Sequence, residues 1–270
     1  MGVKVGVIGT GNMGGAIIKG LLSNHTKYEV YAFDINKQLT ERLSGEYPVT
    51  AMPSIQALAE KSDVVIAAVK PQNMESVLKE CSKTLNRSTL FVSVAVGLPI
   101  AYYSKILGSD KKIVRTMPNT PALVREGVTV ISFGNNVTSE EKQLVKEIFS
   151  CIGIVEELDE SLMSEVTALT SSSPAYVFMM IEAMADAAVQ SGIPRSLSYR
   201  LAAQAVLGSA KMVLETKKHP AELKDMVCSP AGTTIEAVFK LEEKGFRNAI
   251  MAAMKECTKR AIEIGRGMME

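Results

Sequence analysis

The chain of 270 residues contains no tryptophan, only two histidines and only four cysteines. The cysteines, at positions 81, 151, 228 and 257, lie far apart and match none of the spacings of zinc sites. We therefore expect no metal site, and His25 and His219 offer little material for catalysis by histidine. The thiols are interpreted as reduced and inert, which is typical of a cytoplasmic protein.

An excess of one charge and long apolar runs are missing as well. The 30 basic and 29 acidic residues give a net charge of +1, which offers no electrostatic basis for binding nucleic acid or an anionic membrane. No apolar stretch is long enough to cross a bilayer, and the amino terminus enters a predicted strand without the features of a signal peptide. With 47% hydrophobic residues, the chain is expected to be a soluble globular protein of one large or two ordinary domains.

The strongest motif lies at the amino end. Residues 3–8 are predicted to form a short apolar strand, which is followed by GTGNMG at 9–14 and then by an apolar helix. In this context Gly9 permits a tight turn, Gly11 lets the backbone approach a pyrophosphate, and Gly14 allows the helix to pack on the strand. The free N–H groups of the helix start favour phosphate. A second strand, 29–33, ends on Asp34, which suits the hydroxyls of a cofactor ribose.

Strands and helices alternate as far as residue 159. Helices are predicted at 36–44, 55–59, 74–81 and 139–150, and strands at 63–69, 90–96, 113–116, 128–133 and 154–158. From there on only helical patterns remain, at 174–190, 194–216, from 220, from 233 and at 246–265. We therefore predict an α/β fold: a Rossmann-like doubly wound sheet over 1–160 that binds a dinucleotide, followed by an all-helical domain over 161–270. The helix at 174–190 is apolar almost all round, which favours burial, including against a second copy of itself.

Three loops follow predicted strands, at 68–72, 94–97 and 117–121, on the edge of the sheet where ligands bind. Lys70 offers a cation there, and Asn119 offers an amide that can bridge cofactor and substrate. Ordinary strand-to-loop turns are the alternative, because proline and asparagine are common turn residues.

The helical half offers a second candidate region. Gly232, Thr233 and Thr234 lie where a loop becomes a helix, and the N–H groups of a helix start suit a substrate carboxylate. Thr233 and Glu236 have the T-x-x-E spacing of a capping box, which leaves the hydroxyl of Thr234 available. Glu182 and Asp186 share a helix face, and we favour helix packing or a dimer interface over acid–base catalysis for this pair. Lys211 is interpreted as a solvated residue.

Six segments occur in an order that resembles the pyrroline-5-carboxylate reductase family: GTGNMG at 9–14, AVKPQ at 68–72, MPNTP at 117–121, SSPAY at 172–176, LKDMV at 223–227 and SPAGTT at 229–234. The last three are specific to that family, and the resemblance runs from end to end. It implies NAD(P)H-dependent reduction of the C=N bond of 1-pyrroline-5-carboxylate to L-proline, the last step of proline biosynthesis. It also implies a homodimer with interleaved helical domains, often built into a larger ring.

The resemblance also implies which residues form the site. Ser229, Gly232, Thr233 and Thr234 bind the substrate carboxylate, and Thr234 hydrogen-bonds the ring nitrogen. The residues assigned to the cofactor are Gly9, Gly11, Asn12, Met13, Gly14, Asp34, Ser54, Val69, Lys70, Pro71, Ala95, Pro118 and Asn119.

The chain departs from the family pattern at several positions. The family usually has glycine where this chain has Ser171, Ser173 and Ala231, and asparagine where it has Ser54. These changes leave open a diverged paralogue, either a related imine or hydroxyacid reductase or a non-catalytic dinucleotide-binding sensor. Most members accept the 2′-phosphate of NADPH. In this chain the negative charge of Asp34 opposes binding of that phosphate, whereas the positive charge of Lys37 favours it. We predict that both cofactors bind, with NADH used relatively better than is usual for the family.

Overall fold

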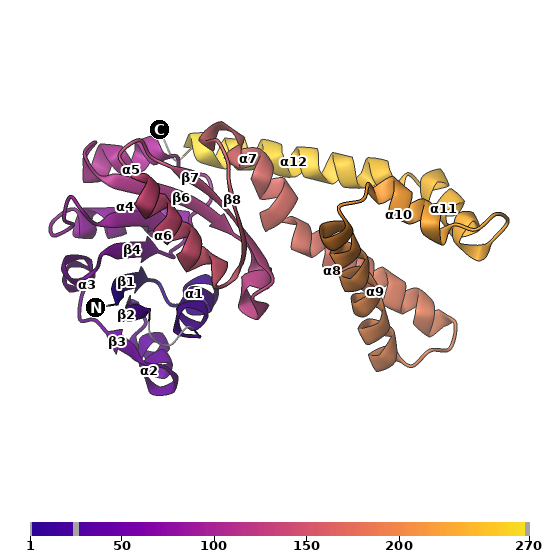
Figure 1. The fold of residues 1–270 in the computed structure, drawn as a ribbon, viewed down its shortest axis with the longest axis horizontal. Coiled ribbons are helices and arrows are strands. Elements are labelled where there is room, and N and C mark those ends of the chain that lie inside the picture. Colours follow the sequence, from indigo (N-terminus) through magenta and orange to yellow (C-terminus); the bar gives the residue numbers. More distant parts are fainter. Residues whose placement is uncertain (1, 24–26, 268–270) are drawn as a thin grey trace. The chain divides into compact units, whose positions relative to one another are not determined.

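The computed structural model describes residues 2–23 and 27–267, and its first part is built on a single sheet of eight strands (Figure 1). The strand order is β3-β2-β1-β4-β5-β6-β7-β8. Neighbouring strands pair in parallel, except that β6 and β7 are antiparallel. The strands are β1 Val3–Ile8, β2 Tyr28–Phe33, β3 Val49–Ala51, β4 Val64–Ala67, β5 Leu90–Ser93, β6 Lys112–Pro118, β7 Gly127–Phe133 and β8 Gly153–Glu157.

Helices cover both faces of this sheet. They are α1 Asn12–Leu22, α2 Lys37–Glu46, α3 Ile55–Lys61, α4 Pro71–Cys81, α5 Ile100–Leu107 and α6 Ser139–Ser150. One core cluster joins α1 and α6 to the sheet through residues such as Ile17, Leu21 and Phe149. A second cluster joins α3, α4 and α5 to it through residues such as Leu58 and Met74. The predicted doubly wound, Rossmann-like fold is confirmed, because strand order reverses beside β1 and both faces are covered.

Several predicted boundaries were wrong. The strand expected over 90–96 ends at Ser93, because the Ser93 hydroxyl accepts the N–H of Ala95 at 3.1 Å and turns the chain out of the sheet. β6 continues to Pro118, in the segment expected to be a loop, because it pairs with β7 as far as Thr129. Strand β3 and helix α5 were not predicted, since β3 is only three residues long and two of these are exposed.

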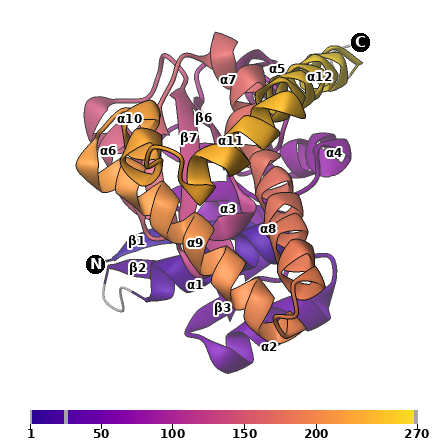
Figure 2. The ribbon, with the colours of Figure 1, turned by 90° about the vertical axis from the view of Figure 1, so that its right-hand side faces the viewer.

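The rest of the chain is helical, as predicted. A short helix α7 (Met163–Val166) runs through a π-helical turn (Thr167–Ser171) into α8 (Ser173–Gln190). Then follow α9 Arg195–Thr216, α10 Pro220–Val227, α11 Thr233–Glu243 and α12 Phe246–Gly267. Helices α8 and α9 pack along each other (Figure 2). Within the described ranges, no helix has the length and apolar character needed to span a bilayer.

The chain divides into two compact units. The first contains the chain up to Ser172 together with the chain from Cys257 onward, and the second contains 173–256. Residues 160–172 join the first unit because Met163 and Val166 pack with Met117 of the sheet. The end of α12 joins it through Ala261, which is buried, and through Cys257, whose thiol lies 3.2 Å from the Ser172 hydroxyl. The boundary at residue 160 stays a prediction about sequence domains.

Candidate functional site

The glycine loop between β1 and α1 is shaped by close contacts within the protein. Gly9 has φ +90°, and a Cβ added to it would lie 2.6 Å from the carbonyl oxygen of Ala68. A Cβ at Gly14 would overlap the carbonyl oxygen of Gly9. The backbone conformation and the approach of α1 to β1 therefore demand glycine at both positions.

Gly11 is different, because the fold does not require it. Apart from its two neighbours in the chain, no atom of the described residues lies within 4 Å of a Cβ added there, and its φ of −65° is open to any residue. Gly11 is the N-cap of α1, and no described side chain caps this helix start. The space beside Gly11 and the uncapped N–H groups fit the pyrophosphate of a dinucleotide. Asn12 and Met13, the first residues of α1, lie next to this space.

Asp34 directly follows β2 and is bonded to the glycine loop. Its Oδ2 accepts the N–H of Thr10 at 2.6 Å and the Thr10 hydroxyl at 3.1 Å, and its Oδ1 accepts the N–H of Asn36 at 2.9 Å. Lys37 begins α2, and Ser54 caps α3 by accepting the N–H of Ala57 at 3.1 Å. The acidic residue lies where the ribose contact is predicted, and it also orders the glycine loop.

The loops after β4 and β5 lie at the same edge as the glycine loop. Ala68 donates its N–H to Ile8 at 2.7 Å, and Val94 donates to Ala67 at 3.2 Å, so hydrogen bonds link the three strand ends. Val69 follows Ala68, and the exposed Lys70 is the N-cap of α4. Pro71 suits the first helical position because its missing N–H would have no partner there. Ala95 is buried in the loop after β5.

Asn119 is held by the protein at both ends of its amide. Its Oδ1 accepts the N–H of Val128 at 2.8 Å, and its Nδ2 donates to the carbonyl of Thr170 at 3.0 Å. The side chain therefore braces the end of β6, just after Pro118, against β7 and the π-helical turn. Each end of the amide keeps one further hydrogen-bonding position, the second N–H of Nδ2 and the second lone pair of Oδ1, so a bridge to cofactor and substrate can form beside these bonds. Sequence spacing alone does not reveal such a brace.

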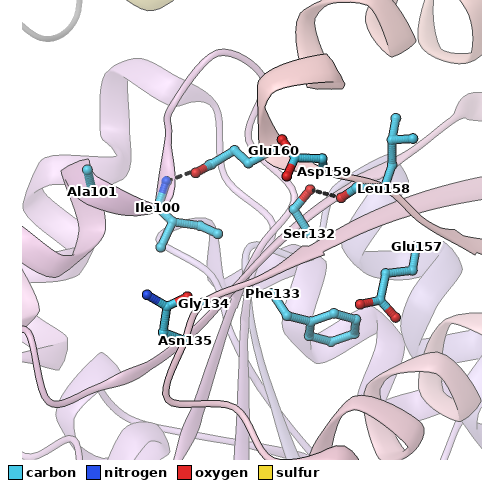
Figure 3. Close-up of a pocket in the computed structure, with 10 residues that line it drawn as sticks. All are labelled: Ile100, Ala101, Ser132, Phe133, Gly134, Asn135, Glu157, Leu158, Asp159 and Glu160. Atoms are coloured by element: carbon cyan, nitrogen blue, oxygen red, sulfur yellow. Dashed lines mark hydrogen bonds between the residues drawn. The ribbon is translucent and has the colours of Figure 1, made fainter.

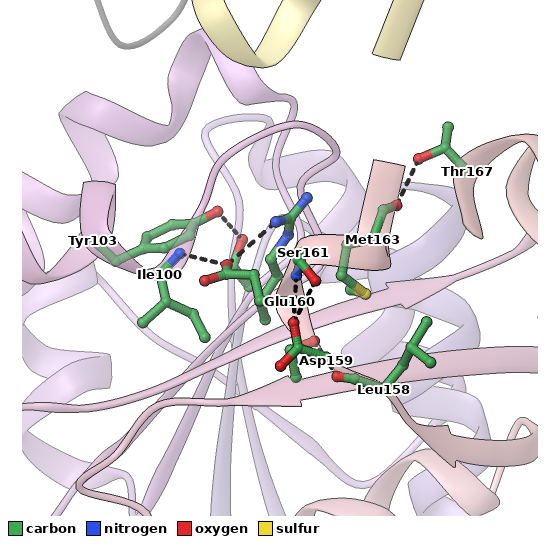
Figure 4. A network of polar contacts seen from close by, with 11 residues as sticks. Ile100, Tyr103, Leu158, Asp159, Glu160, Ser161, Met163 and Thr167 are labelled. Carbon is green, nitrogen blue, oxygen red and sulfur yellow. Dashed lines mark hydrogen bonds and ion pairs between the residues drawn. The ribbon is translucent and has the colours of Figure 1, made fainter. Parts of the chain in front are cut away.

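A polar network behind these loops was missed by the sequence analysis (Figure 4). Glu160 accepts the N–H of Ile100 at 2.7 Å and Nη1 of the buried Arg115 at 3.2 Å, both at Oε1. The hydroxyls of Ser93 and Tyr103 lie 2.6 Å apart, and burial raises the pKa of Tyr103 above its ordinary range. An arginine at 115, inside the strand predicted over 113–116, was the signal available in the sequence.

A cavity of about 610 Å³ lies beside this network, and it contains none of the predicted site residues (Figure 3). Its lining consists of Ile100, Ala101, Ser132, Phe133, Gly134, Asn135, Glu157, Leu158, Asp159 and Glu160. Its carboxylates already have partners: Glu157 pairs with Lys142 and Lys146 at 2.8 and 2.7 Å, and Asp159 accepts the N–H of Ser161 at 2.9 Å. The glycine loop remains the better candidate for the cofactor.

In the second unit, Ser229–Thr234 forms a tight turn into α11. The N-cap is Gly232, whose N–H donates to the carbonyl of Ser229 at 3.0 Å. The predicted capping box of Thr233 and Glu236 is wrong, because Thr233 is already the first helical residue and no described side chain caps α11. Ala231 has φ +54°, so the turn keeps the left-handed conformation that glycine adopts most easily. The first N–H groups of α11 therefore have no side-chain cap among the described residues, and Thr234 lies beside them, half-buried.

The remaining candidates have structural partners. Lys211 is 65% exposed and lies 3.5 Å from Glu215 one turn along α9, as expected for a solvated residue. Asp186 forms an ion pair with Arg195 at the start of α9, which supports a role in helix packing. Among the described residues, no group of three or more histidine, cysteine or acidic side chains is arranged to hold a metal, and His25 lies outside them.

Together, the doubly wound sheet, the open space beside Gly11 and the acidic residue after β2 define a dinucleotide-binding protein of the Rossmann class. Comparison with known proteins agrees. Residues 4–97 match the family described as NADP oxidoreductase, coenzyme F420-dependent, and residues 160–264 match the pyrroline-5-carboxylate reductase dimerisation family. The second match indicates homo-oligomerisation through the helical region.

Full-length relatives specify the family further. The chain is 47% identical to the pyrroline-5-carboxylate reductase of Escherichia coli, over 97% of this chain and 98% of that one. It is 41% identical to that of Methanosarcina acetivorans, over 97% and 98%. The solved reductase from Coxiella burnetii superposes with a TM-score of 0.90 at 32% identity, over 96% and 97%. The solved, NADP-bound enzyme from Plasmodium falciparum superposes with a TM-score of 0.87 at 33% identity, over 97% of this chain and 98% of that one. The chain belongs to the pyrroline-5-carboxylate reductase family, and the resemblance stated from its motifs is confirmed.

Proposed function

We propose that the protein reduces the C=N bond of 1-pyrroline-5-carboxylate to give L-proline, with NADH or NADPH as the reductant. Membership of the reductase family over almost the whole chain is the observation that carries this proposal. The geometry at Gly11 supports it, because the fold itself gives no reason for glycine there. When bound, the reduced nicotinamide supplies the hydride. The protein has to bind the substrate, orient it toward the cofactor and polarise its C=N bond.

The proposed cofactor site follows the edge of the sheet. The loop from Gly9 to Gly14, with Asn12 and Met13, holds the pyrophosphate on the uncapped start of α1. Asp34 and Ser54 lie on the adenosine side. The nicotinamide side is formed by the loops after β4, β5 and β6, and it contains Val69, Lys70, Pro71, Ala95, Pro118 and Asn119.

The proposed substrate site uses the start of α11. Ser229, Gly232 and Thr233 present the turn and the first N–H groups to the substrate carboxylate, because a helix start favours an anion. The hydroxyl of Thr234 holds the ring nitrogen. A cyclic imine that reacts in its protonated form does not require a strong acid from the protein, which agrees with the low histidine content.

The proposed dimer forms through the second unit. A hollow of about 890 Å³ there is lined almost wholly by apolar side chains of α8, α11 and α12, among them Met179, Met184 and Ile250. Met179 is 69% exposed in the single chain, as is typical of a face that a partner covers. Since the matched family region is a dimerisation region, a second copy of this chain is the proposed occupant. The proposal includes assembly of these dimers into a larger ring, which sedimentation of the purified protein tests.

One assay tests the reaction. The purified protein is mixed with 1-pyrroline-5-carboxylate and NADPH or NADH, and the absorbance of the reduced nicotinamide is followed while proline is measured. We expect oxidation of the cofactor matched by proline formation. Tight dinucleotide binding without oxidation would instead identify a non-catalytic sensor. A hydroxyacid reductase would instead oxidise a hydroxyacid with NAD(P)+, and it would lose that activity in Lys211→Ala, a change that we expect to have little effect on reduction of the imine.

A further inference from the structure

The loop between β5 and α5, residues 94–99, is held by an unusually close backbone contact with the last turns of α12. A Cβ added to Gly265 would lie 2.9 Å from the carbonyl oxygen of Gly97. Gly97 itself has φ +87°, and a Cβ there would lie 3.4 Å from Ile264 and 3.6 Å from the backbone of Gly265. Two glycines from distant parts of the chain therefore face each other. A Cβ at Gly265 requires the backbone to move, whereas at Gly97 the Cβ contacts are ordinary and the left-handed φ is what disfavours a larger residue.

The other end of the same loop is held by Glu160. The N–H of Ile100, the first residue of α5, donates to its Oε1 at 2.7 Å, and Arg115 donates to the same oxygen. Leu98 lies between these two contacts and Ala95 lies two residues before Gly97, and both side chains are buried, at 1% and 3% exposure. The loop therefore has little freedom to absorb a displacement at Gly97 without moving at Ala95.

This loop lies where the cofactor is expected. It leaves the carboxyl end of β5, in the second half of the sheet, and in doubly wound folds that edge binds the second mononucleotide of the cofactor. The neighbouring loop after β4 meets the glycine loop at Gly9 and Ala68. A shift of the 94–99 loop thus bears on the nicotinamide half, while the pyrophosphate and adenosine contacts depend on β1, α1 and β2.

We propose that Gly265 is a positioning residue for the nicotinamide half of the cofactor. It does not touch the cofactor. Because it has no side chain, α12 can pack closely against the backbone of Gly97, and this contact fixes the position of the loop that contains Ala95. The inference rests on the proposed function, since it assumes a nicotinamide dinucleotide in the site.

Gly265→Ala tests the contact, and Gly267→Ala is the matched control. Both lie in the last turn of α12, and a Cβ at Gly267 would meet no atom of the described chain within 4 Å. Binding of NADPH is measured by titration of its fluorescence, and binding of ADP, which lacks the nicotinamide, by its inhibition of turnover. In Gly265→Ala we expect the Kd of NADPH to rise on the order of tenfold, because displacement of a binding loop by a fraction of an ångström is enough to misplace a bound ring. ADP binding should match the wild type, as should every property of Gly267→Ala.

A third variant separates this inference from the proposed function. Gly11→Ala should weaken both NADPH and ADP, because both carry the pyrophosphate. If it does so while Gly265→Ala binds NADPH like the wild type, the positioning role is wrong and the proposed function stands. The role is also overturned if Gly265→Ala loses affinity for NADPH and ADP equally, or if Gly267→Ala loses as much affinity for NADPH as Gly265→Ala does. Either result indicates a general disturbance of the structure. Unchanged binding of both ligands in Gly11→Ala overturns the proposed function and this inference with it.

Discussion

Asp34, directly after β2, accepts the backbone N–H of Thr10 at 2.6 Å and the Thr10 hydroxyl at 3.1 Å. This contact joins the residue that is predicted to face the cofactor ribose to the loop that is proposed to hold the pyrophosphate. The carboxylate therefore has a structural role in ordering the loop and an electrostatic role in setting the charge near the ribose. A substitution that preserves the first role and removes the second can separate them.

Asp34→Asn is such a substitution, because the amide oxygen can still accept from Thr10 while the charge is gone. We expect the ratio of kcat/KM for NADPH to that for NADH to rise about fivefold to tenfold, as a carboxylate no longer opposes the 2′-phosphate. Steady-state kinetics with both cofactors measure this ratio. Asp63→Asn, at the start of β4 where Asp63 accepts the N–H of Lys4 at 2.9 Å, is the control. An unchanged ratio in Asp34→Asn would mean that the charge of Asp34 does not influence the choice between NADPH and NADH.

Gly11→Ala and Gly14→Ala should fail for different reasons. A Cβ at Gly11 meets open space, so we expect the variant to keep its melting temperature and to lose affinity for dinucleotides by more than about tenfold. A Cβ at Gly14 overlaps the Gly9 carbonyl, so that variant should lose about 2 kcal/mol of unfolding free energy or more. Urea unfolding and cofactor titration distinguish the two. Gly45→Ala, in the exposed face of α2, is the control, and a stability loss in Gly11→Ala would contradict this account.

Thr234→Ala should lower kcat/KM for the imine by about tenfold to a hundredfold, because it removes a hydrogen bond to the charged ring nitrogen. The Kd of NADPH should stay within about twofold of the wild type. The comparison is Ser209→Ala, an exposed hydroxyl of α9 that donates to Ala205 at 2.8 Å. A large loss of cofactor binding in Thr234→Ala would mean that the assignment of this residue to the substrate site is wrong.

Asn119→Ala should cost about 2 kcal/mol of unfolding free energy, because it leaves the N–H of Val128 and the carbonyl of Thr170 without their partner. Chemical denaturation measures the change. Asn135→Ala, at an exposed position after β7, is expected to shift stability only by a few tenths of a kcal/mol. Equal effects in the two variants would mean that the Asn119 amide is not a brace.

The stability of the protein should fall in alkali. Burial raises the pKa of Cys81 from 9.0 to about 12. As the pH rises above 9, the unfolded chain therefore releases a proton that the folded chain keeps, and stability is lost until the pH reaches the folded pKa. The expected loss is about 1 kcal/mol between pH 9 and 10, and the slope approaches about 1.4 kcal/mol per pH unit above pH 10. Above pH 10 the buried Tyr103, whose pKa is also raised, adds to it.

Urea unfolding at several pH values measures this slope. Cys81→Ala should be less stable at neutral pH, because the side chain is completely buried, and its stability should decline less steeply between pH 9 and 10. The partly exposed Cys228 provides the matched control, and Cys228→Ala should keep the wild-type slope. If Cys81→Ala also keeps it, the alkaline loss has another origin.

The sequence alone was sufficient to predict the family, the doubly wound fold and most helices. These features depend on local patterns: glycine spacing after an apolar strand, apolar residues at helical intervals, and proline at helix starts such as Pro71 and Pro220. It was less reliable where a segment is short or where a side chain ends a strand. The three residues of β3 carry no pattern long enough to read, and the Ser93 hydroxyl stops β5 in a run of valines.

The sequence by itself determined what kind of protein this is, because each motif specifies its own backbone conformation and an expected ligand. Only the tertiary structure decided how the motifs are supported. The Asn119 amide reaches Val128 and Thr170, Glu160 holds the start of α5, and Gly265 lies against Gly97. These contacts join residues that are distant in the chain, and they depend on how helices and strands pack. Packing distances arise only when the whole chain has folded, so no local pattern could predict them.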